Sequence, residues 1–132
     1  MNLTGLAREA IIAKNIIPDE DVLLDVVNPH WDGMPKLYIV TEPTQPADET
    51  QFGAISAETI LKIVGIAEDR HVASGITRQA VSAFHEAFTE LEQTPRSGIL
   101  CVTFIENNLF QIPERSEFQA FFSFRILHNP TL

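Results

Sequence analysis

The side chains best suited to chemistry in this sequence are its four histidines and its single cysteine. Imidazole and thiolate groups bind metals, or act as bases and nucleophiles, when several of them converge at defined spacings. The histidines form no HxH, HExxH or HxxxH pattern, and the cysteine has no CxxC partner. No metal or catalytic centre is therefore expected from this set, which comprises His30, His71, His85, His128 and Cys101.

Two short stretches place a carboxylate two residues from an imidazole, namely Asp69-Arg70-His71 and His30-Trp31-Asp32. Such pairs arise often by chance, and both are better interpreted as turns. Cys101 lies inside the apolar run GILCVTFI, so it is interpreted as a small core residue. With one cysteine, no intramolecular disulfide is possible, and a reducing compartment is expected.

Phosphate-binding and acyl-transfer motifs are also missing, because the sequence contains no P-loop, no GxGxxG and no GxSxG. The glycines are scattered at the edges of predicted elements. Carboxylates are numerous, but acid–base catalysis needs at least one desolvated member, and the sequence singles none out. An enzyme is therefore disfavoured, and no cofactor is predicted.

Length and charge narrow the class of protein further. The chain has 132 residues, which suits a single domain spanning residues 1–132. Its formal net charge is −9, which argues against binding to a nucleic-acid backbone. We see neither a signal peptide nor a membrane span, so no membrane partner is predicted and a cytoplasmic site of synthesis and assembly is expected.

The first half of the chain predicts one helix and short strands. Apolar residues recur every three to four positions and predict a helix over residues 3–15, capped by Asn2 or Thr4. An acidic connector follows, with a short strand within 22–27, and alternation predicts another strand over 36–41. Residues 42–53, EPTQPADETQFG, are predicted to form an exposed loop that carries Glu42, Asp48 and Glu49.

The second half carries the clearest elements. Residues 58–67 are rich in β-branched side chains and predict a strand, although a helical stripe also fits them. Residues 74–92 predict a long amphipathic helix with Ser74 as its N-cap and with Phe84 and Phe88 facing the core.

Two strands are predicted after the long helix, a buried one over 98–105 and a last one over 118–127. Alternate residues of the last strand form a wholly apolar face that is expected to pack on the long helix: Phe118, Ala120, Phe122, Phe124 and Ile126. The other face is mixed and carries Phe121, Arg125 and Leu127, which favours a subunit contact there, although a singly exposed aromatic residue is ordinary. The predicted fold is α+β: an antiparallel or mixed β-sheet packed by one long helix plus a short N-terminal helix.

The second half, ILKIVGIAEDRHVASGITRQAVSAFHEAFTEL followed by two strands ending in FQAFFSFRIL, resembles the tail terminator (tail completion) proteins of long-tailed bacteriophages. In that family a strand is followed by a small gap, a long helix and a terminal β-hairpin. The closing strand often ends in an aromatic-Arg pattern, here Phe124-Arg125-Ile126. The N-terminal helix and the strand near KLYIV match in order.

The resemblance implies a structural role in the virion. Tail terminators form a ring, typically hexameric, that caps the head-proximal end of the tail tube and joins it to the neck. The implied partners are copies of the same chain, the tail tube and the neck or connector proteins, while genome DNA passes the lumen without specific binding. Phe121, Arg125 and Leu127 are then predicted at the subunit interface, and Glu42, Asp48 and Glu49 at the lumen or a neighbouring ring.

Other functions remain open. A different neck, head-completion or tail tube subunit would share this composition and fold class. In a different class, the chain would be a small α+β ligand-binding protein or enzyme, which predicts a concave apolar pocket with converging polar groups. The ring instead predicts self-association through extended contact faces.

Overall fold

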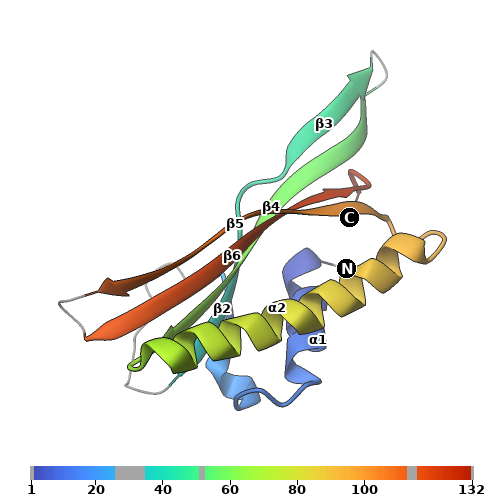
Figure 1. Ribbon diagram of the computed structural model, residues 1–132. Helices are drawn as coiled ribbons and strands as arrows, with labels where there is room; N and C mark the ends of the chain where they lie inside the picture. The colour runs from blue at the N-terminus through green and yellow to red at the C-terminus, as the bar shows by residue number, and fades with distance from the viewer. Residues whose placement is uncertain (1, 26–34, 51–52, 113–115, 132) are drawn as a thin grey trace.

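The protein is a twisted β-sheet with both of its α-helices on one face (Figure 1). The computed structural model describes residues 2–25, 35–50, 53–112 and 116–131. The acidic connector also carries the turn signals Asn28-Pro29 and Asp32-Gly33, and both lie outside these ranges. In chain order the elements are α1 (Leu3–Ile12), a 3-10 turn (Asp19–Asp21), β1 (Val22–Leu24), β2 (Lys36–Thr41), β3 (Gln45–Thr50), β4 (Gly53–Ala67), α2 (Arg70–Gln93), β5 (Ile99–Ile112) and β6 (Glu117–His128).

The sheet has the strand order β1-β2-β4-β6-β5, with β3 paired to β4. Among the strands of the described residues, only β1 and β2 run parallel, and every other pair is antiparallel. The long strands β4 and β6 form the centre, where residues 57–67 pair with residues 118–128. The predicted α+β class, with one long helix and a short N-terminal helix, is confirmed.

The first helix begins where the sequence predicted and ends earlier. Asn2 is the N-cap, and its side chain accepts a hydrogen bond from the Gly5 amide. The helix ends at Ile12 with Ala13 as its C-cap, and Asn15 adopts a positive φ of 53°. Asparagine tolerates this left-handed conformation better than most residues, which accounts for a helix three residues shorter than predicted.

The long helix starts four residues before the predicted boundary. Its N-cap is Asp69 rather than Ser74, and the Asp69 carboxylate accepts hydrogen bonds from the amides of His71 and Val72. Phe84 and Phe88 are fully buried as predicted, with ring centroids 4.4 Å apart. The ring centroids of Phe84 and of Phe124 in β6 are 4.8 Å apart, so aromatic packing holds the helix against the centre of the sheet.

The predicted loop over residues 42–53 is wrong, because residues 45–50 form β3. This strand pairs antiparallel with the first part of β4, with Gln45 opposite Glu58 and Thr50 opposite Gly53. Proline at position 46 misled the prediction, although an edge strand tolerates proline. We call β3 and the paired part of β4, residues 45–50 and 53–57, the hairpin arm; it projects beyond the rest of the sheet (Figure 1).

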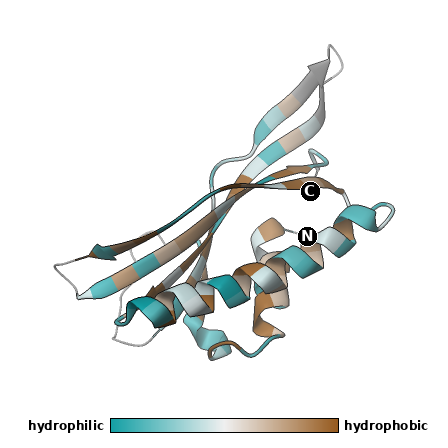
Figure 2. Ribbon diagram, in the orientation of Figure 1, coloured by the Kyte–Doolittle hydropathy of each residue, from teal (hydrophilic) through white to brown (hydrophobic). Residues whose placement is uncertain are grey.

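Hydrophobic residues follow the central strands and the facing sides of the helices, and they also occur along β5 (Figure 2). One core cluster joins α1, α2 and the sheet. Its larger fully buried members are Ile11, Leu37, Ile39, Leu61, Ile63, Phe84, Phe88 and Ile126.

Candidate functional site

The predicted contact residues of β6 share the sheet face that is turned away from α2. Phe124 packs on Phe84 of α2, and Ala120 and Phe122 line a pocket together with α2 residues. Since neighbouring side chains of a strand point to opposite faces, Phe121, Arg125 and Leu127 belong to the other face. The strand alternation predicted from sequence therefore holds.

These residues already have partners within the chain. The Lys62 ammonium lies 5.2 Å from the centroid of the Phe121 ring, and Phe110 of β5 lies edge-on at 6.3 Å. Arg125 is exposed, and its Nε lies 3.6 Å from Oε2 of Glu58. The result is a half-exposed aromatic patch beside an ion pair. Its role in subunit contact stays a prediction.

Strand β5 exposes more hydrophobic surface than the mixed face of β6, and the sequence did not predict this. Residues 98–105 were predicted to be buried, but β5 forms the edge of the sheet and most of it is exposed. Among the described residues, all but one of the exposed large hydrophobic side chains lie on β5: Leu100, Phe104, Ile105 and Phe110, between 40 and 52% exposed. Cys101 is also exposed, so its assignment to the core is wrong.

Two irregularities in β5 coincide with these exposed side chains. The pairing with β6 skips Leu100 between Ile99 and Cys101, and it skips Ile105 between Phe104 and Glu106. A bulge leaves one residue unpaired and breaks the alternation that a buried strand requires. An apolar edge strand invites pairing or contact with another chain. We therefore regard β5 as the principal candidate contact surface.

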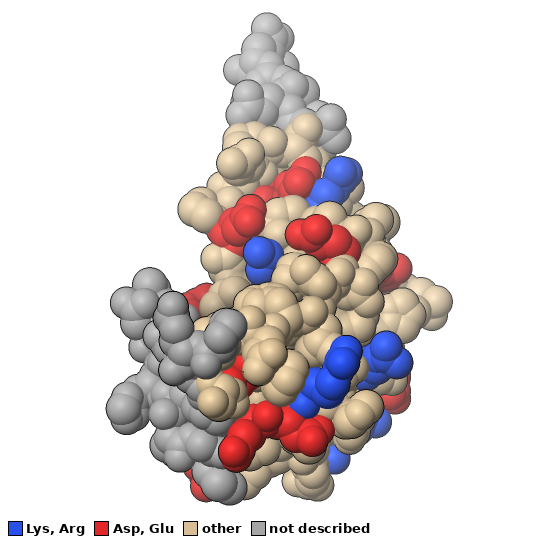
Figure 3. Space-filling view, turned by 60° about the vertical axis from the view of Figure 1, so that its left-hand side comes forward, with Lys and Arg blue, Asp and Glu red and all other residues tan. Residues whose placement is uncertain are grey.

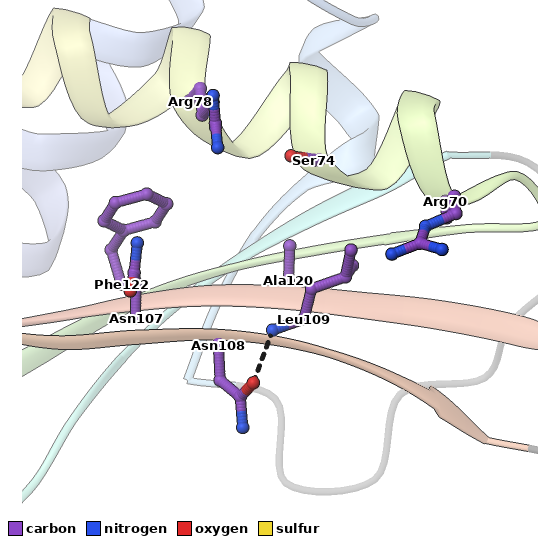
Figure 4. A pocket seen from close by; sticks show the side chains of 8 residues that line it. All are labelled: Arg70, Ser74, Arg78, Asn107, Asn108, Leu109, Ala120 and Phe122. Atoms are coloured by element: carbon purple, nitrogen blue, oxygen red, sulfur yellow. Dashed lines mark hydrogen bonds between the residues drawn. The ribbon is translucent and has the colours of Figure 1, made fainter.

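A groove runs between α2 and the β5–β6 hairpin. A pocket of about 330 Å³ is lined by Arg70, Ser74 and Arg78 of α2 and by residues 107–109, Ala120 and Phe122 of the strands (Figure 4). A second pocket of about 440 Å³ shares Arg78, Asn107 and Phe122 with the first and continues along α2 past Val81 to His85. Because the pockets share these residues, they form one groove.

Within the described ranges, no three histidine, cysteine or carboxylate side chains gather so that they could hold a metal ion. The Asp69-Arg70-His71 stretch is the start of α2 and not the predicted turn, because the Asp69 carboxylate accepts hydrogen bonds from the His71 and Val72 amides and caps the helix. The His30-Trp31-Asp32 stretch lies outside the described residues.

Charge is distributed unevenly over the molecule. The face in Figure 3 carries separate groups of basic and acidic side chains rather than a continuous basic surface. Neither pocket of the groove is lined by an aspartate or glutamate, although the chain has 18 acidic residues against 9 lysines and arginines. The groove is thus a basic site on an acidic protein.

Of the three acidic residues predicted to lie in a loop, Glu42 precedes the hairpin arm, and Asp48 and Glu49 belong to its first strand. Glu42 is exposed between β2 and β3, and its amide donates to the carbonyl of Ile60. Asp48 pairs with Ser56 and Glu49 with Ala54, with register shifts on both sides of Asp48. Their predicted place at a lumen or a neighbouring ring stays a prediction.

A partly buried series of hydrogen bonds lies at the root of this arm. The His128 Nδ1 atom donates to the Asn129 carbonyl at 2.7 Å, since a carbonyl only accepts. In the neutral ring, Nε2 then accepts from the Thr59 hydroxyl at 2.8 Å, and Thr59 in turn lies 2.7 Å from the Thr44 hydroxyl. The chain links β6, β4 and the segment that enters β3.

The comparison with known proteins gives a likeness in structure alone. No family model matches the sequence, and no curated protein matches it. The fold, however, is similar to that of a virion chain. That chain comes from the structure described as the virion of native gene transfer agent (GTA) particle, with a TM-score of 0.62 and 16% sequence identity. The match covers 96% of this chain and 94% of the other, so the two share the fold over nearly their whole lengths.

In the part of the chain that the structure describes, neither helix combines the length and apolar character needed to cross a lipid bilayer.

Proposed function

We propose that this protein is a structural subunit of a phage-like virion and, more specifically, a tail terminator that forms a ring at the head-proximal end of the tail tube. The observation that carries the proposal is the match to a chain of the gene transfer agent virion across 96% of this chain. The resemblance of the long helix and closing hairpin to tail terminators supports the finer assignment.

The exposed edge of β5 supports an assembly function. A long edge strand with hydrophobic side chains such as Phe104 and Ile105 is costly for a protein that stays alone in solution. Burial of these side chains against a neighbouring chain removes that cost. The mixed face of β6, with Phe121, Arg125 and Leu127, adjoins β5 through Phe110, whose ring lies edge-on to Phe121 at 6.3 Å, while Phe104 lies on the opposite side of the sheet beside Phe124.

Net charge fits the proposed position in the particle. A ring at the head-proximal end of the tail tube surrounds the path of the genome. A chain with a net charge of −9 repels DNA phosphates. Glu42, Asp48 and Glu49 are the residues proposed to face this lumen or an adjoining ring. DNA then passes without specific binding, and neither a metal nor a cofactor has a part in the function.

Purified protein added to growing tail tubes tests the proposal. A terminator binds one tube end and stops growth there, so tubes are expected to become shorter and more uniform as protein is added. Negative-stain images should show added density at one end only. Density along the whole tube would instead identify a tube subunit, and tubes that grow unchanged with bare ends would refute the terminator function.

A further inference from the structure

We infer that the acidic turn Asp19–Asp21 of one copy of this chain docks into the groove between α2 and β5 of the next copy, with its two exposed carboxylates against Arg70 and Arg78. This inference rests on the proposed ring and identifies two surfaces that meet in it. Both surfaces consist of residues on the helical side of the sheet.

The groove offers two positive charges without an acidic neighbour. Arg70 and Arg78 are exposed and line the groove from α2, and within the described residues neither forms an ion pair. The two residues are separated by about 12 Å along the helix axis. A guanidinium recognises a carboxylate through two parallel hydrogen bonds, so this pair of arginines favours an acidic occupant.

The helical layer leaves the β5 side of the sheet partly uncovered. The first helix packs on β1 and β2, while α2 packs on β4, β5 and β6. The ring of Phe104 in β5 belongs to this helical side, because its centroid lies 6.1 Å from that of Phe122 and 5.9 Å from that of Phe124. Phe104 is nevertheless 52% exposed. The space beside α2 therefore suits an element of a neighbouring chain that continues the helical layer.

The side chains of the groove are placed to receive such an element. In Figure 4, Arg70 and Arg78 project from α2 on one side, while Leu109 and Phe122 lie on the strands opposite. Leu109 and Phe122 are both only partly buried. An occupant thus meets cationic groups on the helix and apolar groups on the strands.

The turn Asp19–Asp21 has the complementary charge. Asp19 and Glu20 are exposed, and neither forms an ion pair with a described residue, whereas the third carboxylate of the turn pairs with Lys36. Arg8 of α1 donates from Nη2 to the Asp19 carbonyl at 2.9 Å, which holds the backbone of the turn beside the helical layer. The first two carboxylates of the turn are therefore available to a partner.

The acidic side chains of the two helices suit this contact less well. The carboxylate of Glu86 pairs with Lys14, and that of Glu92 accepts a hydrogen bond from a backbone amide of β5. Glu9 and Glu90 line a pocket between α1 and α2, inside the helical layer rather than at its edge. The turn is instead next to an edge strand.

The two surfaces belong to opposite edges of the sheet. The turn leads directly into β1, the first strand in the sheet order, and the groove borders β5, the last strand. Both helices lie on one face of the sheet (Figure 1), so the turn beside α1 and the groove beside α2 share one layer. A contact between two different patches is head-to-tail, and its repetition produces a ring when the rotation closes.

Charge exchange between the two surfaces tests the inference. The Arg70→Glu/Arg78→Glu and the Asp19→Lys/Glu20→Lys variants should each weaken self-association by about tenfold, because each turns attraction into repulsion. The variant with all four changes should regain most of the native association. Asp19→Asn/Glu20→Gln, which keeps the size of both side chains, should weaken association by a smaller factor.

Two control variants change the total charge equally at other exposed positions. Lys14→Glu/Arg96→Glu matches the arginine variant, and Glu9→Lys/Glu90→Lys matches the variant of the turn. None of these four residues lines the groove or belongs to the turn. Both controls should associate like the native protein.

Association is measured as solution mass over a concentration series, with circular dichroism to verify folding. Unchanged association in the exchanged variants, no recovery in the four-site variant, or equal weakening in the controls would each overturn the inference. A native protein that stays monomeric at about millimolar concentration would overturn it as well.

Tube capping by the same samples separates this contact from the proposed function. A variant of the turn that associates and caps tubes like the native protein removes the contact and leaves the terminator function intact. Native protein that associates through these charges but leaves tube growth unchanged keeps the contact and removes the terminator function.

Discussion

The hydroxyl of Thr77 occupies the space where residue 65 would carry a side chain. A Cβ atom placed on Gly65 would lie 1.9 Å from Thr77 Oγ1, and 3.0 Å from the carbonyl oxygen of Ala73. The same Thr77 hydroxyl donates to that carbonyl at 2.6 Å, which holds it in place. Glycine at position 65 therefore lets α2 approach β4 closely, and this approach brings the aromatic side chains of α2 onto the sheet.

Replacement of Gly65 by alanine should destabilise the protein by about 1–3 kcal/mol or more, because the added methyl group has to displace buried atoms. Gly75→Ala is the matched control: nothing lies within 4 Å of its added methyl, and alanine favours a helix. Chemical denaturation of the two variants compares their free energies of unfolding. A Gly65 variant as stable as the Gly75 variant would contradict the close approach.

The hydrogen-bond chain at the root of the hairpin arm gives a second prediction. Thr59→Val keeps the shape of the side chain but leaves the buried Nε2 of His128 without its donor, at a cost of about 1–3 kcal/mol. Thr103→Val, at an exposed position of β5, should change stability by less than about 0.5 kcal/mol. Equal free energies of unfolding of the two variants would show that these hydrogen bonds contribute nothing to stability.

The mixed face of β6 gives a third prediction. Phe121→Asp or Leu127→Asp should block ring formation without unfolding the monomer, because both side chains are only partly buried. Solution mass measures the assembly and circular dichroism the folding. If either variant is unfolded, its side chain is required for the core and the proposed contact at that position is wrong.

The edge strand gives a fourth prediction. Ile105→Lys places a charge at a bulge where the side chain is 46% exposed, so the free energy of unfolding should change by less than about 0.5 kcal/mol. Assembly should fail, because a lysine on an edge strand opposes contact with another chain. Ile126→Lys, in contrast, should unfold the monomer, since Ile126 is fully buried. Normal assembly of the Ile105 variant would exclude β5 from the interface.

The elements with strong periodicity were predictable from the sequence. The stripe around Phe84 and Phe88 identified the long helix and its buried face, and strict alternation identified the two faces of β6. The helix start was missed because two residues, Asp69 and Ser74, both suit an N-cap. Local sequence does not show which of them has free backbone amides beside it.

The surfaces that carry the proposals were not predictable in the same way. The run GILCVTFI looks like a buried strand because hydrophobicity alone does not distinguish the centre of a sheet from its edge. The bulges at Leu100 and Ile105 depend on the pairing with β6, which local sequence does not encode. The hairpin arm was missed because prolines and acidic residues are typical of loops as well as of edge strands.

The groove requires tertiary structure for the same reason. Arg70 and Arg78 are two turns apart on one helix, and their significance arises only from the strand residues opposite them, such as Asn107. The charge pattern of α2 alone predicts no more than a solvated helix face.

The position of the protein in the assembled particle tests the central claim most directly. Particles assembled with an epitope-tagged chain are labelled with gold-conjugated antibody and imaged by electron microscopy. The account predicts label at a single place on each particle, where the tail tube meets the head. Label along the tube, at the far end of the tail or over the head would contradict the terminator function.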